Sequence, residues 1–217
     1  EVAEATELAR AIGIAHESID TSEMDDPDYV KNNPDRCFHC KDELYGKLQA
    51  LARDRGFAAV LDGCNLDDTG DFRPGRRAAD QHSVRSPLVE AGLTKADIRE
   101  LSRERGLPTW DKPAMACLSS RIPYGTPVTI ETLSLVERAE AYLRSLGLCQ
   151  LRVRHQVLAS GDPTARIETD DAGLEVLLAH RAEITSELRT IGYLYVTLDL
   201  AGYRTGSLNE VLKQKQS

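Results

Sequence analysis

Hydrophobic residues in the first part of the chain follow two alternating patterns. Residues 2–12 carry apolar side chains at intervals of three and four and are followed by Gly13, which predicts a helix. Residues 14–19 are predicted to form a short strand. A second helix over residues 39–56 and a short apolar run, 57–61, repeat the pattern, and we expect that run to be a buried strand. Helices that alternate with short apolar strands are typical of a parallel α/β sheet.

The pattern changes beyond a Pro-rich, non-periodic stretch, 107–127, which is long for a connector. The periodicity predicts helices over 94–106, 129–147 and 172–192, and strands over 151–155, 165–168 and 193–198. Thr94 and Thr129 are the expected N-caps, and the third helix is expected to break near His180. The β-β-α-β order at the end of the chain is typical of a small α+β domain.

Composition narrows the class of protein. We predict two domains, residues 1–126 and 127–217, in a chain of 217 residues with a net charge of −8. That charge argues against a large face for duplex nucleic acid, and no apolar run reaches the length of a membrane span. Five cysteines without a secretory signal argue for free thiols in the cytoplasm rather than a disulfide framework. Residue 1 is Glu and the sequence opens mid-domain, so we expect a segment to precede it.

Cysteines are the strongest candidates for chemistry. Cys37 and Cys40 form a C-x-x-C pair, which is either half of a metal site or a chance pair of structural cysteines. Cys117 is surrounded by small and hydroxyl residues with Arg121 nearby, an environment that stabilises a thiolate. The alternative for Cys117 is an inert buried cysteine. Cys64 and Cys149 are expected to serve packing.

Polar residues supply further candidates. Asn65, Asp67 and Asp68 follow the strand predicted at 57–61, where ligands bind in open α/β sheets, and their oxygens suit Mg²⁺ or a nucleotide. A solvated turn explains them equally well.

On their strand Arg152 and Arg154 point to one face, and two guanidinium groups side by side suit a phosphate or a carboxylate. The alternative is a charged outer face. His155 points the other way and is expected to pack. Arg166 joins the pair if its strand lies alongside. Surface exposure is the default expectation for the acidic groups of this half, which are Glu140, Glu168, Asp170 and Asp171.

Several blocks of sequence, taken together and in order, resemble the LarE family over nearly the whole chain. They are Asn33–Lys41, Asp62–Asp68, Arg73–Gly75, Ser86–Lys95, Leu107–Pro113, Ala116–Gly125, Arg152–His155 and Asp199–Ser207. LarE proteins are ATP-dependent sulfurtransferases of the PP-loop pyrophosphatase superfamily, whose domain is of the adenine nucleotide alpha hydrolase (HUP) type. They thiolate pyridinium-3,5-biscarboxylic acid mononucleotide on the route to the nickel-pincer cofactor of lactate racemase.

The resemblance implies a mechanism and a set of sites. ATP, with Mg²⁺, adenylylates a substrate carboxylate, and the Cys117 thiolate attacks the acyl-adenylate. In one branch of the family the cysteine gives up its own sulfur. In the three-cysteine branch Cys37, Cys40 and Cys117 hold a 4Fe–4S cluster with one iron open for a sulfide. The implied partners are a nucleotide-like small molecule, other proteins of cofactor biosynthesis and further copies of the chain, with no membrane and no duplex nucleic acid.

The remaining implied roles are carried over residue by residue. Those near ATP or the cofactor are Asn65, Asp67, Asp68, Ser119, Ser120 and Arg121. Arg152 and Arg154 resemble the pair that binds the substrate phosphate, and Glu140 and Asp171 are the metal candidates.

One departure from the family is expected to matter. The phosphate loop of the superfamily, Ser-Gly-Gly-x-Asp-Ser, does not occur in these residues, which predicts an N-terminally truncated domain with weak or absent ATP hydrolysis. Two alternatives stay open: another PP-loop enzyme, such as a tRNA thiolase or an amidotransferase-like ligase, and a non-catalytic cluster-binding interaction protein.

Overall fold

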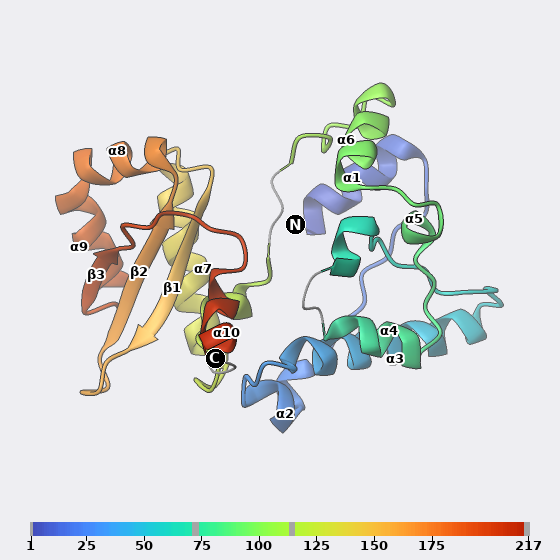
Figure 1. Cartoon of the computed structure of the whole chain (residues 1–217), viewed down its shortest axis with the longest axis horizontal. Helices are drawn as coiled ribbons and strands as arrows, with labels where there is room; N and C mark the ends of the chain where they lie inside the picture. Colours follow the sequence, from blue (N-terminus) through green and yellow to red (C-terminus); the bar gives the residue numbers. More distant parts are fainter. Residues whose placement is uncertain (1, 71–73, 113–115, 215–217) are drawn as a thin grey trace. The chain divides into compact units, whose positions relative to one another are not determined.

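The computed structural model describes residues 2–70, 74–112 and 116–214. The chain forms two compact units, Glu1–Tyr29 with Pro34–Pro113 and Val30–Asn33 with Ala114–Ser217, and each is described by itself (Figure 1). The second unit thus starts earlier in the chain than the predicted boundary at 126/127, and the predicted domain limits themselves stay a prediction.

The first unit is built from helices among its described residues (Figure 1). Their bounds are α1 Val2–Ile12, η1 Glu23–Asp25, α2 Pro27–Val30, α3 Arg36–Asp54, η2 Leu66–Gly70, α4 Gly75–Gln81, α5 Pro87–Glu90 and α6 Lys95–Glu104. α6 starts as predicted, because Thr94 accepts a hydrogen bond from the Asp97 backbone N–H and Asp97 accepts one in return.

The parallel sheet expected in the first unit is not formed in the part that the structure describes. Residues 14–19 have no strand pairing, and the second predicted strand is reduced to one parallel bridge between Leu61 and Arg85. Phe57 is 65% exposed and Leu61 56%, while Val60 is buried. A strand exists only through its neighbours, and this apolar run finds a single paired residue; the prediction of a buried strand is wrong.

The helices α3 and α4 make the small core of the first unit. Tyr45 of α3 packs with Ala78 and Ala79 of α4. The two helices meet closely at Gly75, where an added Cβ would lie 3.3 Å from the Cys37 carbonyl oxygen. Glycine at the start of α4 therefore allows close contact with the helical turn that carries Cys37.

The second unit is an α+β fold with a three-stranded sheet (Figure 1). Its elements are η3 Leu118–Arg121, α7 Ile130–Ser145, β1 Leu151–Val157, β2 Pro163–Thr169, α8 Asp171–Ala179, α9 Arg181–Ile191, β3 Tyr195–Leu198, η4 Ser207–Asn209 and α10 Glu210–Gln214. β1 pairs antiparallel with β2, and β2 pairs parallel with β3. The predicted helices and strands of this half are confirmed, including the cap at Thr129 and the helix break at His180.

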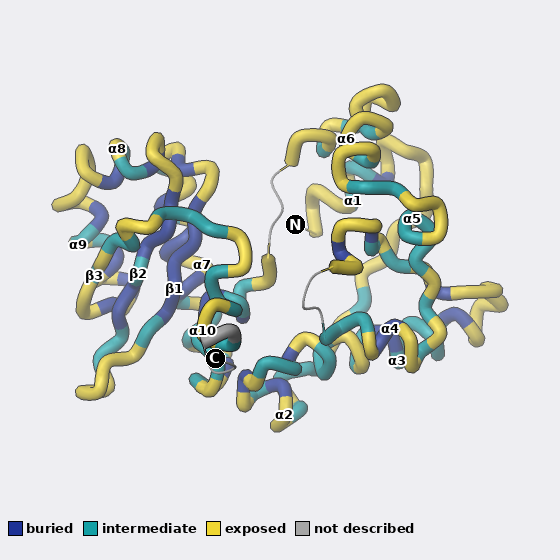
Figure 2. The backbone as a smooth tube through the Cα atoms, viewed as in Figure 1, coloured by how far each residue is buried: buried dark blue, intermediate teal, exposed yellow. Residues whose placement is uncertain are grey.

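The two faces of this sheet differ in chemistry. The apolar face packs on α7 and α9 and forms the main core. Figure 2 shows that β1 and β2 are largely buried, whereas β3 is not. Its fully or nearly buried members include Ala139, Leu143, Leu151, Val153, Ala165, Ile167, Leu188 and Tyr193. His155 lies on this face, 2% exposed and 5.8 Å from the Tyr193 ring centre, which confirms its predicted packing role.

The opposite face is polar and is contacted by the C-terminal segment, residues 199–209. Arg154 lies across from Arg166, and Arg152 lies across from Glu168. Arg152 is 7% exposed and Arg154 3%, so the alternative of a charged outer face is wrong. Burial of these side chains means that each needs a hydrogen-bonding partner inside the unit.

Candidate functional site

The thiol of Cys117 lies on a short loop of the second unit, residues 116–121, which we call the thiol loop. Cys117 is exposed and caps the turn η3. Its carbonyl oxygen accepts hydrogen bonds from the Ser120 backbone N–H at 3.0 Å and the Ser120 hydroxyl at 2.7 Å. The expectation of an inert buried cysteine is therefore wrong. Residues 113–115, part of the same sequence block, lie outside the described residues.

Arg121 holds this loop from inside the unit. Its Nη1 donates to the carbonyl oxygens of Ala116 at 2.7 Å and Cys117 at 3.2 Å. Its Nε and Nη2 donate to both oxygens of Glu140, at 2.7 and 3.1 Å. Arg121 is 3% exposed and Glu140 0%, so the loop backbone is tied to a buried ion pair on α7.

Glu140 has no oxygen left for a further ligand of ordinary geometry. Besides Arg121, it accepts from the Val153 backbone N–H at 3.1 Å and from Arg144 at 2.7 Å. Burial alone raises the pKa of Glu140, but the hydrogen bonds and charge of Arg121, with Val153 and Arg144, lower it below its ordinary value. Glu140 was expected at the surface, and that expectation is wrong: its buried carboxylate is the counter-charge of Arg121.

Arg154 forms a second anchor of the same kind. Its Nε and Nη2 donate to the two oxygens of Glu168, both at 2.9 Å, and Glu168 is 0% exposed. Nη1 donates to the Ser120 carbonyl oxygen at 2.7 Å, and Nη2 also donates to the Ser207 hydroxyl at 2.6 Å. Glu168 was likewise expected at the surface, and that expectation is wrong.

Arg152 differs from its neighbour in its partners. Its Nη1 donates to the Arg204 carbonyl oxygen and its Nη2 to the Tyr203 hydroxyl, each at 2.9 Å. The guanidinium carbon also lies 4.3 Å from the Tyr203 ring centre. Burial and the charges of Arg154 and Arg121 lower the pKa of Arg152, against the influence of Tyr203 and Glu168. No carboxylate hydrogen-bonds to Arg152 among the described residues, and the role of the Arg152–Arg154 pair in binding a substrate phosphate stays a prediction.

The predicted metal residues do not come together. Among the described residues, the one group with ligand atoms within 4.8 Å of one another is Asp26, Asp28 and His39, which includes neither Glu140 nor Asp171. His39 Nδ1 lies 3.2 Å from an Asp26 oxygen, an ordinary ion pair that explains the approach. The metal role of Glu140 and Asp171 stays a prediction that this geometry does not favour.

Cys37 and Cys40 lie in the first turn of α3, in the first unit. Cys37 is exposed and Cys40 half-buried, and neither forms a disulfide. Their spacing of three places both thiols along one side of the helix. The three-cysteine cluster with Cys117 stays a prediction.

The acidic loop of the first unit is more ordered than a solvated turn. Asn65 and Asp68 are buried, at 8% and 5% exposure, and Asp67 accepts from the Lys95 backbone N–H at 2.7 Å. Asp68 pairs with the Lys95 ammonium at 3.0 Å. The alternative of a solvated turn is wrong for Asn65 and Asp68, while the nucleotide role of the loop stays a prediction.

Asp62 is a residue that the sequence argument passed over. It accepts hydrogen bonds from the Ser86 hydroxyl, the Cys64 backbone N–H and the Tyr45 hydroxyl, at 2.7, 3.1 and 3.2 Å. Although burial raises the pKa of Asp62, these hydrogen bonds lower it overall. Asp62 thus fixes the start of the acidic loop, and its place directly after the apolar run was the available signal.

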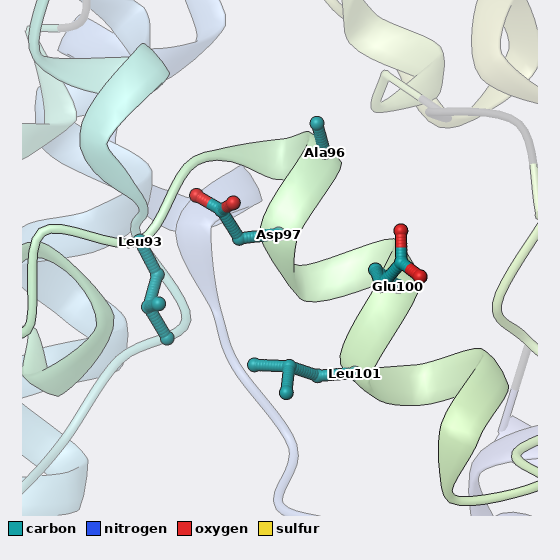
Figure 3. Close-up of a pocket in the computed structure, with 5 residues that line it drawn as sticks. All are labelled: Leu93, Ala96, Asp97, Glu100 and Leu101. Atoms are coloured by element: carbon teal, nitrogen blue, oxygen red, sulfur yellow. The ribbon is translucent and has the colours of Figure 1, made fainter.

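Other features add no candidate site. Cys149 is exposed, so its expected packing role is wrong. An open depression of about 370 Å³ on α6 is lined by Leu93, Ala96, Asp97, Glu100 and Leu101 (Figure 3). It contains no predicted site residue, and its Asp97 already serves the helix cap. No helix in the described ranges is both long and apolar enough to cross a membrane.

The fold and site define a class: a mixed α/β protein that presents an exposed thiol on a loop anchored by two buried arginine–glutamate pairs. No protein-family model matches the chain. It is 46% identical over 214 residues, 98% of this chain and 78% of the relative, to the uncharacterized protein slr1717 of Synechocystis. It is 41% identical over 190 residues, 87% of this chain and 67% of the relative, to the pyridinium-3,5-bisthiocarboxylic acid mononucleotide synthase of Lactiplantibacillus plantarum.

A third relative is the uncharacterized protein MJ0830 of Methanocaldococcus jannaschii, 30% identical over 176 residues, 81% of this chain and 67% of the relative. Identity of this extent to the bacterial synthase shows the family. The chain belongs to the LarE family of sulfurtransferases.

Proposed function

We propose that the chain is an ATP-dependent sulfurtransferase that makes pyridinium-3,5-bisthiocarboxylic acid mononucleotide, with Cys117 as the sulfur-handling residue. The support is the 41% identity to the synthase of that name, together with an exposed Cys117 thiol on a loop held by buried ion pairs. A nucleophile on a fixed loop can be held at attack distance from an activated carbon, which is the main contribution a protein makes to such a step.

The proposed chemistry follows from the substrate. A free carboxylate repels a thiolate and has no good leaving group, so ATP first converts it to an acyl-adenylate and releases pyrophosphate. The Cys117 sulfur then forms a bond to the acyl carbon while AMP leaves. Loss of the Cα proton and cleavage of the Cβ–Sγ bond release the thiocarboxylate and leave dehydroalanine at position 117.

A cluster is the other source of sulfur implied by the family. The chemistry of the three donors suits such a cluster, because Cys37, Cys40 and Cys117 form no disulfide and thiolates are the usual ligands of iron–sulfur clusters. A 4Fe–4S cluster on these residues would supply a bound sulfide and leave the cysteine intact.

Substrate binding is proposed at Arg152. A phosphate is a dianion that suits a buried guanidinium with polar neighbours, and Tyr203 places both a ring and a hydroxyl beside it. The acidic loop is proposed to face ATP with its Mg²⁺, and assembly with further copies of the chain, together with a cytoplasmic location, also remains part of the proposal.

The test compares Cys117→Ser with Cys149→Ser, a matched change at an exposed cysteine of the same unit. Both are measured in the full-length protein with ATP and pyridinium-3,5-biscarboxylic acid mononucleotide, and the thiolated product is detected by mass spectrometry. We expect Cys117→Ser to abolish product and Cys149→Ser to leave it unchanged. Formation of thiolated product by Cys117→Ser at the wild-type rate would contradict the proposal.

The source of sulfur is read from the protein after turnover. Loss of one H₂S from the Cys117 peptide indicates the sacrificial route. An intact Cys117 peptide, bound iron, and loss of both iron and product in Cys37→Ala indicate the cluster route.

A further inference from the structure

The backbone carbonyls of the thiol loop are hydrogen-bonded by two buried guanidinium groups, that of Arg121 at the end of the loop and that of Arg154 on β1. η3 is a single turn of four residues, and the Cys117 side chain does not form a capping hydrogen bond to it. Such a short 3₁₀ turn is weak by itself. Three carbonyl oxygens of the thiol loop accept hydrogen bonds from guanidinium groups: those of Ala116 and Cys117 from Arg121, and that of Ser120 from Arg154.

Arg154 is immobilised by its other partners. It is 3% exposed, and Glu168, to which it is bonded at two points, is 0% exposed. The contacts to Glu168, Ser120 and Ser207 together use all three nitrogens of the guanidinium. These bonds use four of the five N–H groups of Arg154, whereas Arg152 donates to only two acceptors, the Arg204 carbonyl and the Tyr203 hydroxyl.

We propose that Arg154 and Glu168 are positioning residues for the Cys117 thiol: the buried pair fixes the Ser120 carbonyl and thereby the place of the sulfur. This inference rests on the proposed function for its kinetic consequence. Its structural part, a loop held by the pair, does not depend on which reaction the thiol performs.

The difficulty in testing it is that a broken buried ion pair also destabilises the fold. The double variant Arg154→Met with Glu168→Met removes both charges together, and such replacements of a buried pair often restore stability. The contact to Ser120 stays lost in the double variant. A positional role and a merely structural role therefore predict different results for it.

Arg166 provides the matched control. Arg166 also pairs with Glu168, at 3.3 Å, and its second ion pair is with Asp199, at 2.8 Å, which lies outside the thiol loop. Arg166→Met removes one of the two cations that pair with Glu168 and leaves the hydrogen bond from Arg154 to the Ser120 carbonyl in place. We expect it to leave amide exchange in the thiol loop at the wild-type rate.

The experiment measures three quantities in the full-length protein. These are the urea midpoint, hydrogen exchange of the Ser120 and Ile122 amides, and kcat and KM for thiolation. For the double variant we expect a midpoint above that of either single variant, and exchange in the loop about 10-fold faster or more, since the loop opens locally. We expect kcat to fall about 100-fold with KM within about threefold, as for a misplaced reacting group.

Two outcomes would overturn the proposal. One is a double variant that recovers kcat together with its stability, which would make the pair merely structural. The other is loop exchange in Arg154→Met no faster than in Arg166→Met. If the loop exchange changes as expected but wild-type protein forms no thiolated product, the proposed function fails while the positional role stands.

Discussion

Replacing Glu140 with glutamine removes the charge of a carboxylate that accepts four hydrogen bonds from three residues. Glu140 accepts from Arg121, Arg144 and the Val153 backbone N–H. An amide has one acceptor oxygen and two N–H groups of its own. In Glu140→Gln the amide NH₂ therefore faces N–H groups of Arg121 or Arg144 in place of a carboxylate oxygen. Arg121, at 3% exposure, keeps its charge without a counter-charge.

The magnitude follows from burial. Removing one partner of a buried ion pair costs about 3–5 kcal/mol. The same carboxylate also pairs with Arg144, whose side chain is 39% exposed, and pairs near the surface are worth about 0–1 kcal/mol. Glu140→Gln should therefore lower the free energy of unfolding several times as much as Arg144→Gln does. Both variants break the Glu140–Arg144 pair, but only Glu140→Gln also breaks the buried pair with Arg121.

Urea unfolding followed by circular dichroism measures this difference. With a slope of about 2 kcal/mol per molar urea, a loss of about 4 kcal/mol moves the midpoint by about 2 M. The amide of Val153 provides a local check, because β1 is an edge strand and this N–H bonds to Glu140. Its hydrogen exchange should accelerate in Glu140→Gln and not in Arg144→Gln. Equal midpoints for the two variants would refute the reasoning from burial.

Three further predictions concern stability. Burial lowers the pKa of His155, so its neutral form is favoured in the folded state and stability falls as the pH drops below about 6.5. His155→Phe, which keeps a ring beside Tyr193, should remove this contribution to the fall in the urea midpoint between pH 7 and pH 5. Gly173→Ala should destabilise the second unit by about 1–3 kcal/mol in urea unfolding, although alanine usually favours helix, because the new Cβ would collide with Thr169 Oγ1. Thr94→Ala should cost about 1 kcal/mol by loss of the N-cap, measured the same way.

The elements of the second unit could be predicted because their signals are local. The cap at Thr129 and the break at His180 each depend on neighbouring residues, and the structure has both. Alternation along β1 correctly placed Arg152 and Arg154 on one face and His155 on the other. Periodicity decides these features without knowledge of the rest of the chain.

The strands of the first unit could not be decided in this way. The run 57–61 is apolar, yet Phe57 and Leu61 are more than half exposed and a single residue of the run makes a bridge. Whether an apolar run forms a buried strand depends on neighbours that are distant in sequence. A helix such as α3 makes its backbone hydrogen bonds within its own segment, so its periodicity was enough to predict it.

The candidate site shows the same division between local and distant information. Cys117 could be singled out from the residues beside it, but its anchors could not. Glu140 and Glu168 look like surface carboxylates in sequence, and a rule based on frequency places them in solvent. Their burial follows from tertiary pairing, 19 residues from Arg121 and 14 from Arg154.

Arg152 and Arg154 have different hydrogen-bond partners, although both lie on the polar face of β1. In sequence the two arginines are equivalent, two residues apart on one face. In the structure Arg154 donates to the carboxylate of Glu168 and to oxygens of Ser120 and Ser207, whereas Arg152 has two neutral oxygen acceptors and a ring. Neutral acceptors can be exchanged for a phosphate at far lower cost than a buried carboxylate, because the exchange adds a charge-assisted bond rather than breaking one. If the proposed function holds, we therefore expect replacement of Arg152 to weaken substrate binding more than it slows the thiol step, and replacement of Arg154 to do the reverse.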